Sequence, residues 1–242
     1  MMDRSLLRKV VAEALGTALL LVAVVGSGIA AQRLSPGASG LELFENAVAT
    51  GCALAVIILA LGPVSGAHLN PVVSLVDAAL GGLRRRELVP YITAQVGGAV
   101  VGVIVANLMF SRAPVSVSTH LRFGPGLWLG ELVATFGLLL VIFGVSRSGR
   151  SAVVPFAVGA YITGAYFFTS STSFANPAVT MARELSNTFA GISPSSVLPF
   201  IAAQLIGAAL AWLLVSALFP RERDFAHVVV VAHDPAAQEA AL

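Results

Sequence analysis

The sequence predicts an all-α membrane protein with six membrane-spanning helices and two re-entrant half-helices. Of its 242 residues, 57% are hydrophobic and 11% are charged, which is too apolar for an ordinary soluble domain. Two copies of an Asn-Pro turn, at Asn70 and Asn176, predict the half-helices. Six apolar segments approach the roughly 20 residues that a helix needs to cross a bilayer; they are 10–31, 46–62, 89–110, 127–146, 153–170 and 196–219.

The first apolar segment follows basic residues, as the core of a signal peptide would. Its run is long enough to span a membrane and no cleavage site is evident, so we interpret it as the first spanning helix. Cys52 is the only cysteine, which excludes an intramolecular disulfide and a cysteine cluster for a metal. We expect Cys52 to face away from any lumen, and we expect no metal and no cofactor.

Each Asn-Pro turn is expected to start a short helix. The Asn side chain can accept a hydrogen bond from a free N–H of the first turn, and Pro suits the first helical position because it has no N–H to leave unpaired. The stretches 70–82 and 176–188 are too short to cross a bilayer. We predict that they enter from opposite faces, with their N-termini meeting near the bilayer centre.

The two halves of the sequence repeat the same features in the same order. A Glu-x3-Thr pair at Glu13 recurs at Glu131, and an apolar run beginning with Gln95 recurs at Gln204. Because each half holds three spans, the second half must enter the membrane from the other side, which makes an inverted repeat.

One domain is therefore expected over residues 1–224, with repeat halves at about 8–111 and 126–220 and a cytoplasmic tail at 225–242. Small residues are typical of close helix packing in membranes; those that we assign to this role are Gly97, Gly98, Gly102 and Gly207.

The basic residues lie in short clusters between apolar segments, which is typical of membrane topology rather than of a nucleic-acid surface. The lipid bilayer is thus an expected partner, and a nucleic acid is not. The positive-inside rule then favours cytoplasmic N- and C-termini in a plasma membrane, which we take to be a bacterial inner membrane. This orientation places inside Arg4, Arg8, Lys9, Arg84, Arg85, Arg86, Arg147, Arg150, Arg221 and Arg223, and outside only Arg33, Arg112, Arg122 and Arg183.

The motifs SGAHLNP and FANP, the repeated Glu-x3-Thr pairs and the six spans together resemble the aquaporin and aquaglyceroporin (major intrinsic protein) family over nearly the whole chain. The resemblance implies an aquaporin-like homotetramer of independent pores that pass water or small neutral solutes. It also implies that Glu13 and Glu131 accept hydrogen bonds from the re-entrant loops. The run NPAVTMARELSNTFAGI from Asn176 is similar to that of bacterial members associated with arsenic resistance.

In such a pore, Asn70 and Asn176 would offer amide donors, while backbone carbonyls around 66–68 and 172–174 would offer acceptors. A neutral hydroxylated solute exchanges water for these groups at little cost, whereas a cation meets two positive helix ends and loses its hydration shell. Plain helix capping is the alternative role for the asparagines, and the two roles are compatible.

The sequence departs from the family at the selectivity filter. The common second turn reads Asn-Pro-Ala-Arg, and Val179 stands where that arginine is expected. Counting from the asparagines places Thr50, Gly164 and Ser173 at the other filter positions. Water-selective members resemble one another in having a bulky aromatic and a histidine at the helix positions, so we expect a wider and less polar filter here.

Arg183 lies four residues beyond Val179, which is about one helical turn, so the two side chains are expected on nearly the same helix face. Because side chains on a helix lean toward its N-terminus, Arg183 can reach back as a displaced filter arginine. The alternative is a local pair with Glu184 or a loop acceptor.

Three other polar side chains have two interpretations each. Glu13 and Glu131 either support the re-entrant loops or couple transport to protons. His68 either helps to hold its loop or senses pH. Asp77 is expected to meet the arginines at 84–86.

We therefore expect a passive channel for water, glycerol-like polyols and neutral metalloid hydroxides such as arsenous acid. The alternatives are a proton-coupled secondary transporter built on inverted repeats and a water-selective aquaporin. An enzyme is disfavoured because the sequence shows no evident nucleophile–base pair, metal cluster or phosphate loop.

Overall fold

The computed structural model describes residues 3–219, and all six predicted spans are present as helices within them. Each is long and apolar enough to cross a membrane, with α6 counted together with the short 3-10 helix η1 (Ser151–Val153) that precedes it. The predicted tail at 225–242 lies outside the described residues. The spanning helices are α1 (Arg4–Leu34), α2 (Ser39–Ser65), α4 (Arg85–Met109), α5 (Pro125–Arg147), α6 (Val154–Phe168) and α8 (Pro194–Leu218).

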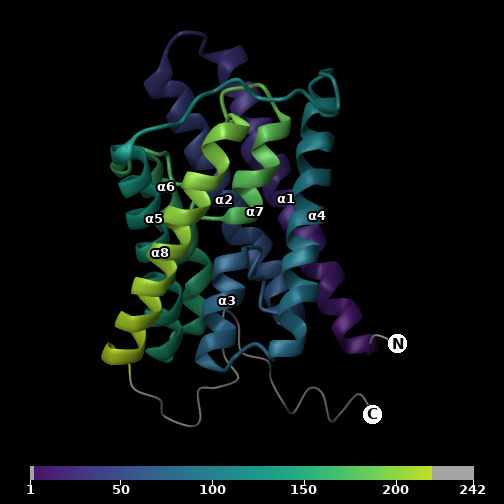
Figure 1. Cartoon of the computed structure of the whole chain (residues 1–242). Helices are drawn as coiled ribbons and strands as arrows, with labels where there is room; N and C mark the ends of the chain where they lie inside the picture. Colours follow the sequence, from purple (N-terminus) through teal and green to yellow (C-terminus); the bar gives the residue numbers. More distant parts are fainter. Residues whose placement is uncertain (1–2, 220–242) are drawn as a thin grey trace.

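The two half-helices are also present, and they enter from opposite ends of the bundle. Helix α3 (Pro71–Leu80) lies in the lower half of Figure 1 and α7 (Pro177–Ala182) in the upper half, with their first turns facing each other in the middle. Helix α7 is shorter than predicted, because the chain tightens into the 3-10 helix η2 (Arg183–Leu185) and becomes extended at Ser186.

Helix packing follows the inverted repeat. Within the first half α1 packs mainly against α4, and within the second half α5 packs mainly against α8. The halves meet where α2 packs against α6, and each half-helix also touches the last spanning helix of the other half, α3 with α8 and α7 with α4. The fold class predicted from the sequence is therefore confirmed.

Glycines let the paired helices approach closely. A Cβ atom at Gly98 or Gly102 would overlap a carbonyl oxygen of α1, and a Cβ at Gly207 would overlap the backbone of α5. Gly97 differs from the prediction, because a Cβ there would meet nothing within 4 Å. It lies beside Gly98 in the sequence, and successive residues on a helix point about 100° apart.

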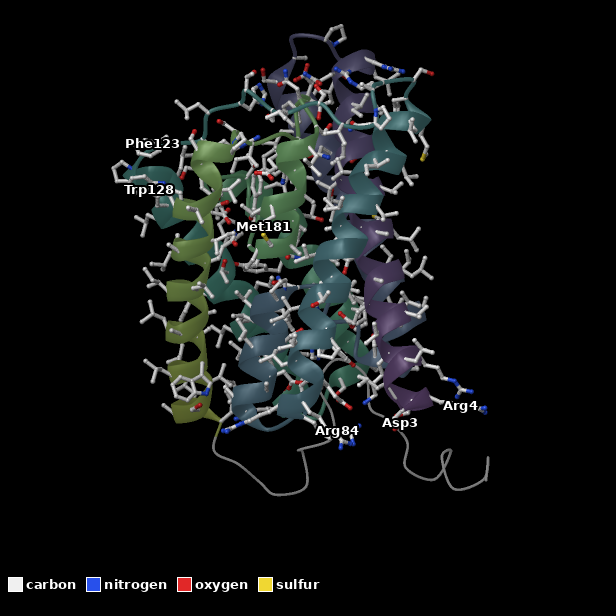
Figure 2. All side chains as sticks on the ribbon, turned by 45° about the vertical axis from the view of Figure 1, so that its right-hand side comes forward. Asp3, Arg4, Arg84, Phe123, Trp128 and Met181 are labelled. Atoms are coloured by element: carbon white, nitrogen blue, oxygen red, sulfur yellow. The ribbon has the colours of Figure 1, made fainter. Side chains whose placement is uncertain are left out.

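A long connecting loop, residues 110–124, crosses the upper end of the bundle in Figure 1. It is held to η2 by backbone hydrogen bonds from Ser116 to Leu185 (3.0 Å) and from Ser118 to Glu184 (2.8 Å). Figure 2 shows Phe123 and Trp128 at this upper end, and Asp3, Arg4 and Arg84 at the opposite, lower end. The loop that joins the two halves is thus bound to the second half at the upper end of the bundle.

Candidate functional site

The two asparagines cap the half-helices as the Asn-Pro turns predict. The side-chain oxygen of Asn70 accepts from the backbone N–H of Val72 (3.1 Å). The side-chain oxygen of Asn176 accepts from those of Ala178 (3.0 Å) and Val179 (3.3 Å). Pro occupies the first helical position in both.

The same asparagines join the two halves. The amide nitrogen of Asn70 donates to the carbonyl of Ala175, and that of Asn176 donates to the carbonyl of Leu69, both at 2.8 Å. Each acceptor is the residue immediately before the other asparagine. The starts of α3 and α7 therefore meet, as the inverted repeat requires.

The loops that lead into these turns have an unusual backbone. Ala67 and Leu69 in the first loop, and Ser173 and Ala175 in the second, have φ between 45° and 53°. Residues with a Cβ rarely adopt this left-handed conformation, which costs of order 1–3 kcal/mol where the surroundings enforce it.

Two buried carboxylates hold the loops in this conformation. Glu13 accepts from the backbone N–H groups of His68 (3.0 Å) and Leu69 (2.7 Å). Glu131 accepts from those of Phe174 (2.8 Å) and Ala175 (2.9 Å). The equivalent carboxylate thus holds the equivalent pair of amides in each half.

A glutamine supports each carboxylate. Gln95 donates to Glu13 (2.8 Å) and to the hydroxyl of Ser74 (2.9 Å), and Gln204 donates to Glu131 (2.5 Å) and to the hydroxyl of Thr180 (2.8 Å). Neither hydroxyl was predicted from the sequence. Their signal was present, because Ser74 and Thr180 each lie four residues after the capping asparagine of their half.

A cavity runs beside this junction and is lined by both halves. Two thirds of its lining residues, 14 of 21, are apolar, so it has a wide apolar wall and a small set of polar groups. The polar lining residues are Thr50, His68, Asn70, Tyr166, Ser173, Asn176 and Arg183.

Three of the four predicted filter residues line the cavity, namely Thr50, Ser173 and Val179. The structure differs at Gly164, whose hypothetical Cβ would contact Phe168 instead. Tyr166, two residues further along α6, lines the cavity in its place, and its hydroxyl donates to that of Thr50 (3.2 Å). Two residues correspond to about 200° around a helix, so Gly164 and Tyr166 point in nearly opposite directions.

Arg183 is buried and lines the cavity. Its guanidinium carbon lies 3.5 Å from the centre of the Phe174 ring, and its Nε donates to the carbonyl of Ala190. No ion pair with Glu184 occurs in the described part of the chain. The side chain of Arg183 therefore reaches the cavity and also binds a loop acceptor.

His68 lines the cavity and contacts α3. Its Nδ1 lies 3.0 Å from the Ser74 hydroxyl, and its Nε2 lies 3.5 Å from a carboxylate oxygen of Asp77. The expectation that Asp77 meets the arginines at 84–86 is wrong, because Asp77 lies on the buried face of α3 and Arg84 pairs with Glu87.

The remaining sequence features add no chemistry. Cys52 is exposed and absent from the cavity lining, as predicted. Within residues 3–219, no group of His, Cys, Asp or Glu side chains is arranged to hold a metal ion.

Comparison with known proteins identifies the family of this chain. The model of the family described as "Major intrinsic protein" matches residues 1–173. This chain belongs to the major intrinsic protein family. Proteins of the family are membrane channels rather than enzymes.

Curated members of the family cover most of the chain. The aquaglyceroporin AqpS of Rhizobium meliloti is 51% identical over 219 residues, which are 88% of this chain and 93% of that protein. The probable aquaporin AqpM of Archaeoglobus fulgidus is 30% identical over 242 residues, covering 88% of this chain and 97% of its own. The X-ray structure of the aquaglyceroporin from Plasmodium falciparum matches with a TM-score of 0.65 at 20% identity, covering 91% of this chain and 98% of that chain, and supports the fold.

Proposed function

We propose that this major intrinsic protein is a passive channel for water, glycerol-sized polyols and neutral metalloid hydroxides such as arsenous acid. The observation that carries the proposal is the cavity that both capping asparagines line at the junction of the two half-helices. The 51% identity to an aquaglyceroporin supports a solute range that includes glycerol.

The junction has spare hydrogen-bonding capacity for a solute. Each asparagine amide has two N–H groups, and one of them is used on the opposite loop. The Ser173 hydroxyl lines the cavity and has no hydrogen-bond partner among the described residues. A neutral solute can use these groups in place of water, whereas the positive ends of α3 and α7 oppose a cation.

We assign the filter to Thr50, Tyr166, Ser173 and Val179, with Arg183 as its displaced arginine. Tyr166 replaces the predicted Gly164, so an aromatic ring lines the cavity where the sequence suggested a residue without a side chain. Val179 and the ring supply apolar surface to this filter, and Thr50, Ser173 and Arg183 supply hydroxyl and guanidinium groups. A polyol suits such an opening, because it has carbon-bound hydrogens to place on the apolar side and hydroxyls for the polar groups.

Glu13 and Glu131 are assigned to loop support rather than proton coupling. The donors to these carboxylates are backbone N–H groups of the loops, the side-chain amides of the two glutamines and, for Glu13, the hydroxyl of Ser65 (2.7 Å). We also assign His68 to holding its loop, through Ser74 and Asp77.

The assembly and topology belong to the same proposal. We take residues 1–224 as one channel domain that forms a homotetramer in the bacterial inner membrane, with cytoplasmic termini. Arg4 and Arg84 lie at the lower end in Figure 2, which supports a cytoplasmic position for that end by the positive-inside rule.

Proteoliposome swelling tests the proposal directly. Vesicles containing the protein are expected to admit water, glycerol and arsenous acid faster than protein-free vesicles, with non-saturating fluxes. Water flow without solute flow would instead identify a water-selective channel. Concentrative uptake that collapses with an uncoupler would identify the proton-coupled transporter.

A further inference from the structure

Two arginines from distant parts of the chain converge on the ring of Phe174, which lines the cavity. The guanidinium carbon of Arg183 lies 3.5 Å from the centre of the Phe174 ring, and that of Arg122 lies 5.1 Å from the same centre. Phe174 itself is fixed, because Glu131 binds its backbone N–H and its ring packs edge-on against Phe200. A guanidinium over an aromatic face is attracted by the ring quadrupole.

The same two arginines also bind three successive carbonyls of one loop. Arg183 donates to Ala190, while Arg122 donates to the residues on either side, to Phe189 (3.2 Å) and Gly191 (2.9 Å). Arg122 thus fixes the stretch of backbone that carries the Arg183 acceptor.

The backbone at Arg122 is itself held by hydrogen bonds to the start of α8. Its backbone N–H donates to the Ser196 hydroxyl in the first turn of α8 (3.0 Å). The carbonyl of His120, two residues earlier, accepts from the backbone N–H of Ser193 at the start of the same helix (2.7 Å). The connecting loop is therefore anchored where the Arg122 side chain departs.

Neither arginine is held by a carboxylate. Within the described residues, no Asp or Glu oxygen lies within 4 Å of either guanidinium. Two like charges near one ring repel each other, so their positions depend on the ring and the loop carbonyls. The segment at 189–191 has further bonds from the Phe189 N–H to Gln32 (3.0 Å) and from the Gly191 N–H to the carbonyl of Thr188 (2.8 Å). The bonds from Arg122 are the ones that fix the two carbonyls flanking the Arg183 acceptor, so their loss lets that acceptor shift.

We propose that Arg122 is a positioning residue for the filter: it holds the carbonyls at 189–191 and the Phe174 ring so that Arg183 stays at the cavity. This inference rests on the proposed role of Arg183 as the displaced filter arginine. The filter of this chain is then built from both repeat halves and from the loop that connects them.

The experiment compares glycerol and water permeability in the same proteoliposomes, because the ratio of the two is independent of the amount of folded protein. Arg122→Gln removes the charge and the fork of donors. We expect it to raise the glycerol-to-water ratio about fivefold, the change that corresponds to roughly 1 kcal/mol of barrier. Arg112→Gln is the matched control, because Arg112 lies on the same loop and is exposed; its ratio should stay at the wild-type value.

The double variant separates positioning from an independent charge effect. If Arg122 acts through Arg183, then Arg122→Gln has no further effect in an Arg183→Gln background. Multiplied effects in the double variant, or an Arg122→Gln ratio equal to that of Arg112→Gln, would overturn the inference while leaving Arg183 as a filter residue. An unchanged ratio in Arg183→Gln alone would reject the filter role itself, and this inference with it.

A conservative variant covers failure to fold. Arg122→Lys keeps the charge but cannot bind two carbonyls with one planar group. If Arg122→Gln yields no folded channel, Arg122→Lys is expected to raise the ratio in the same direction. A wild-type ratio in Arg122→Lys would then contradict positioning by the guanidinium fork.

Discussion

Asn70 and Asn176 bind each other's loops: each side-chain amide donates at 2.8 Å to the carbonyl that precedes the other asparagine. The two contacts are equivalent under the repeat, so one pair of residues both caps the half-helices and joins the halves. The junction consequently depends on side chains that also line the cavity.

Replacing one of these asparagines is expected to weaken the whole junction. Asn176→Ala removes a helix cap and the bond to Leu69, which together should cost about 2–3 kcal/mol of stability. Thermal unfolding in detergent measures the loss. Asn187→Ala serves as the control because Asn187 is exposed and its side chain, among the residues that the structure describes, binds only Thr119 of a loop. Equal unfolding temperatures for the two variants would contradict the prediction.

Glu131→Gln tests support against proton coupling. The new amide group turns one acceptor into a donor, which leaves either the N–H of Phe174 or the N–H groups of both Ala175 and Gln204 without an acceptor and should cost about 1–3 kcal/mol. If Glu131 only supports the loop, an imposed pH gradient is expected to leave the rate of solute flux unchanged, both in the wild type and in the folded fraction of the variant.

Glu184→Gln is the control variant for that experiment, because Glu184 lies near the upper end of the bundle and is only partly buried. A flux that follows the pH gradient in the wild type, and stops doing so in Glu131→Gln, would favour the coupled transporter.

Adjacent glycines on α4 offer a matched test of helix packing. Gly98→Ala places a methyl group against the Ala14 carbonyl of α1, whereas Gly97→Ala places it in open space. We expect Gly98→Ala to destabilise the protein by about 1–3 kcal/mol and Gly97→Ala to have little effect. Unfolding midpoints of the two variants at one detergent concentration decide the matter, and equal midpoints would refute the close approach of α1 and α4.

His120 should make stability depend on pH. Partial burial, together with the positive charges of Arg122 and Arg183, lowers the pKa of His120 below its ordinary 6.5. The unfolded chain therefore binds a proton at a higher pH than the folded chain, so stability falls as the pH drops from 6.5 toward the lowered pKa. The unfolding temperature should decline over this range, and His120→Asn should decline less; identical curves would show that His120 is not involved.

The fold and the centre of the site could be read from the sequence because they depend on local patterns that repeat. Apolar runs of spanning length predicted the six helices, and the paired Asn-Pro turns, Glu13 with Glu131 and Gln95 with Gln204, marked equivalent positions. All of these patterns are contiguous or duplicated, so each half supported the reading of the other.

The filter was harder to predict because it depends on which face of a helix meets the cavity. Counting back from Asn176 selected Gly164. That count passes through residues 169–176, where three residues have a left-handed backbone conformation with positive φ, so helical spacing does not apply there. Ile162 and Tyr166 line the cavity, and their spacing of four residues was the available sign of a shared face. For Arg122, the sequence predicted only the side of the membrane, from its positive charge. Its contacts could not be predicted because they join segments about 50 to 70 residues apart.

The clamping of both loops by a carboxylate and by the opposite asparagine has a kinetic consequence. A molecule can pass the middle of this protein without any helix having to swing, and no conformational cycle has to be completed for each crossing. Passage then has the shallow temperature dependence of movement through water rather than the steep one of a carrier.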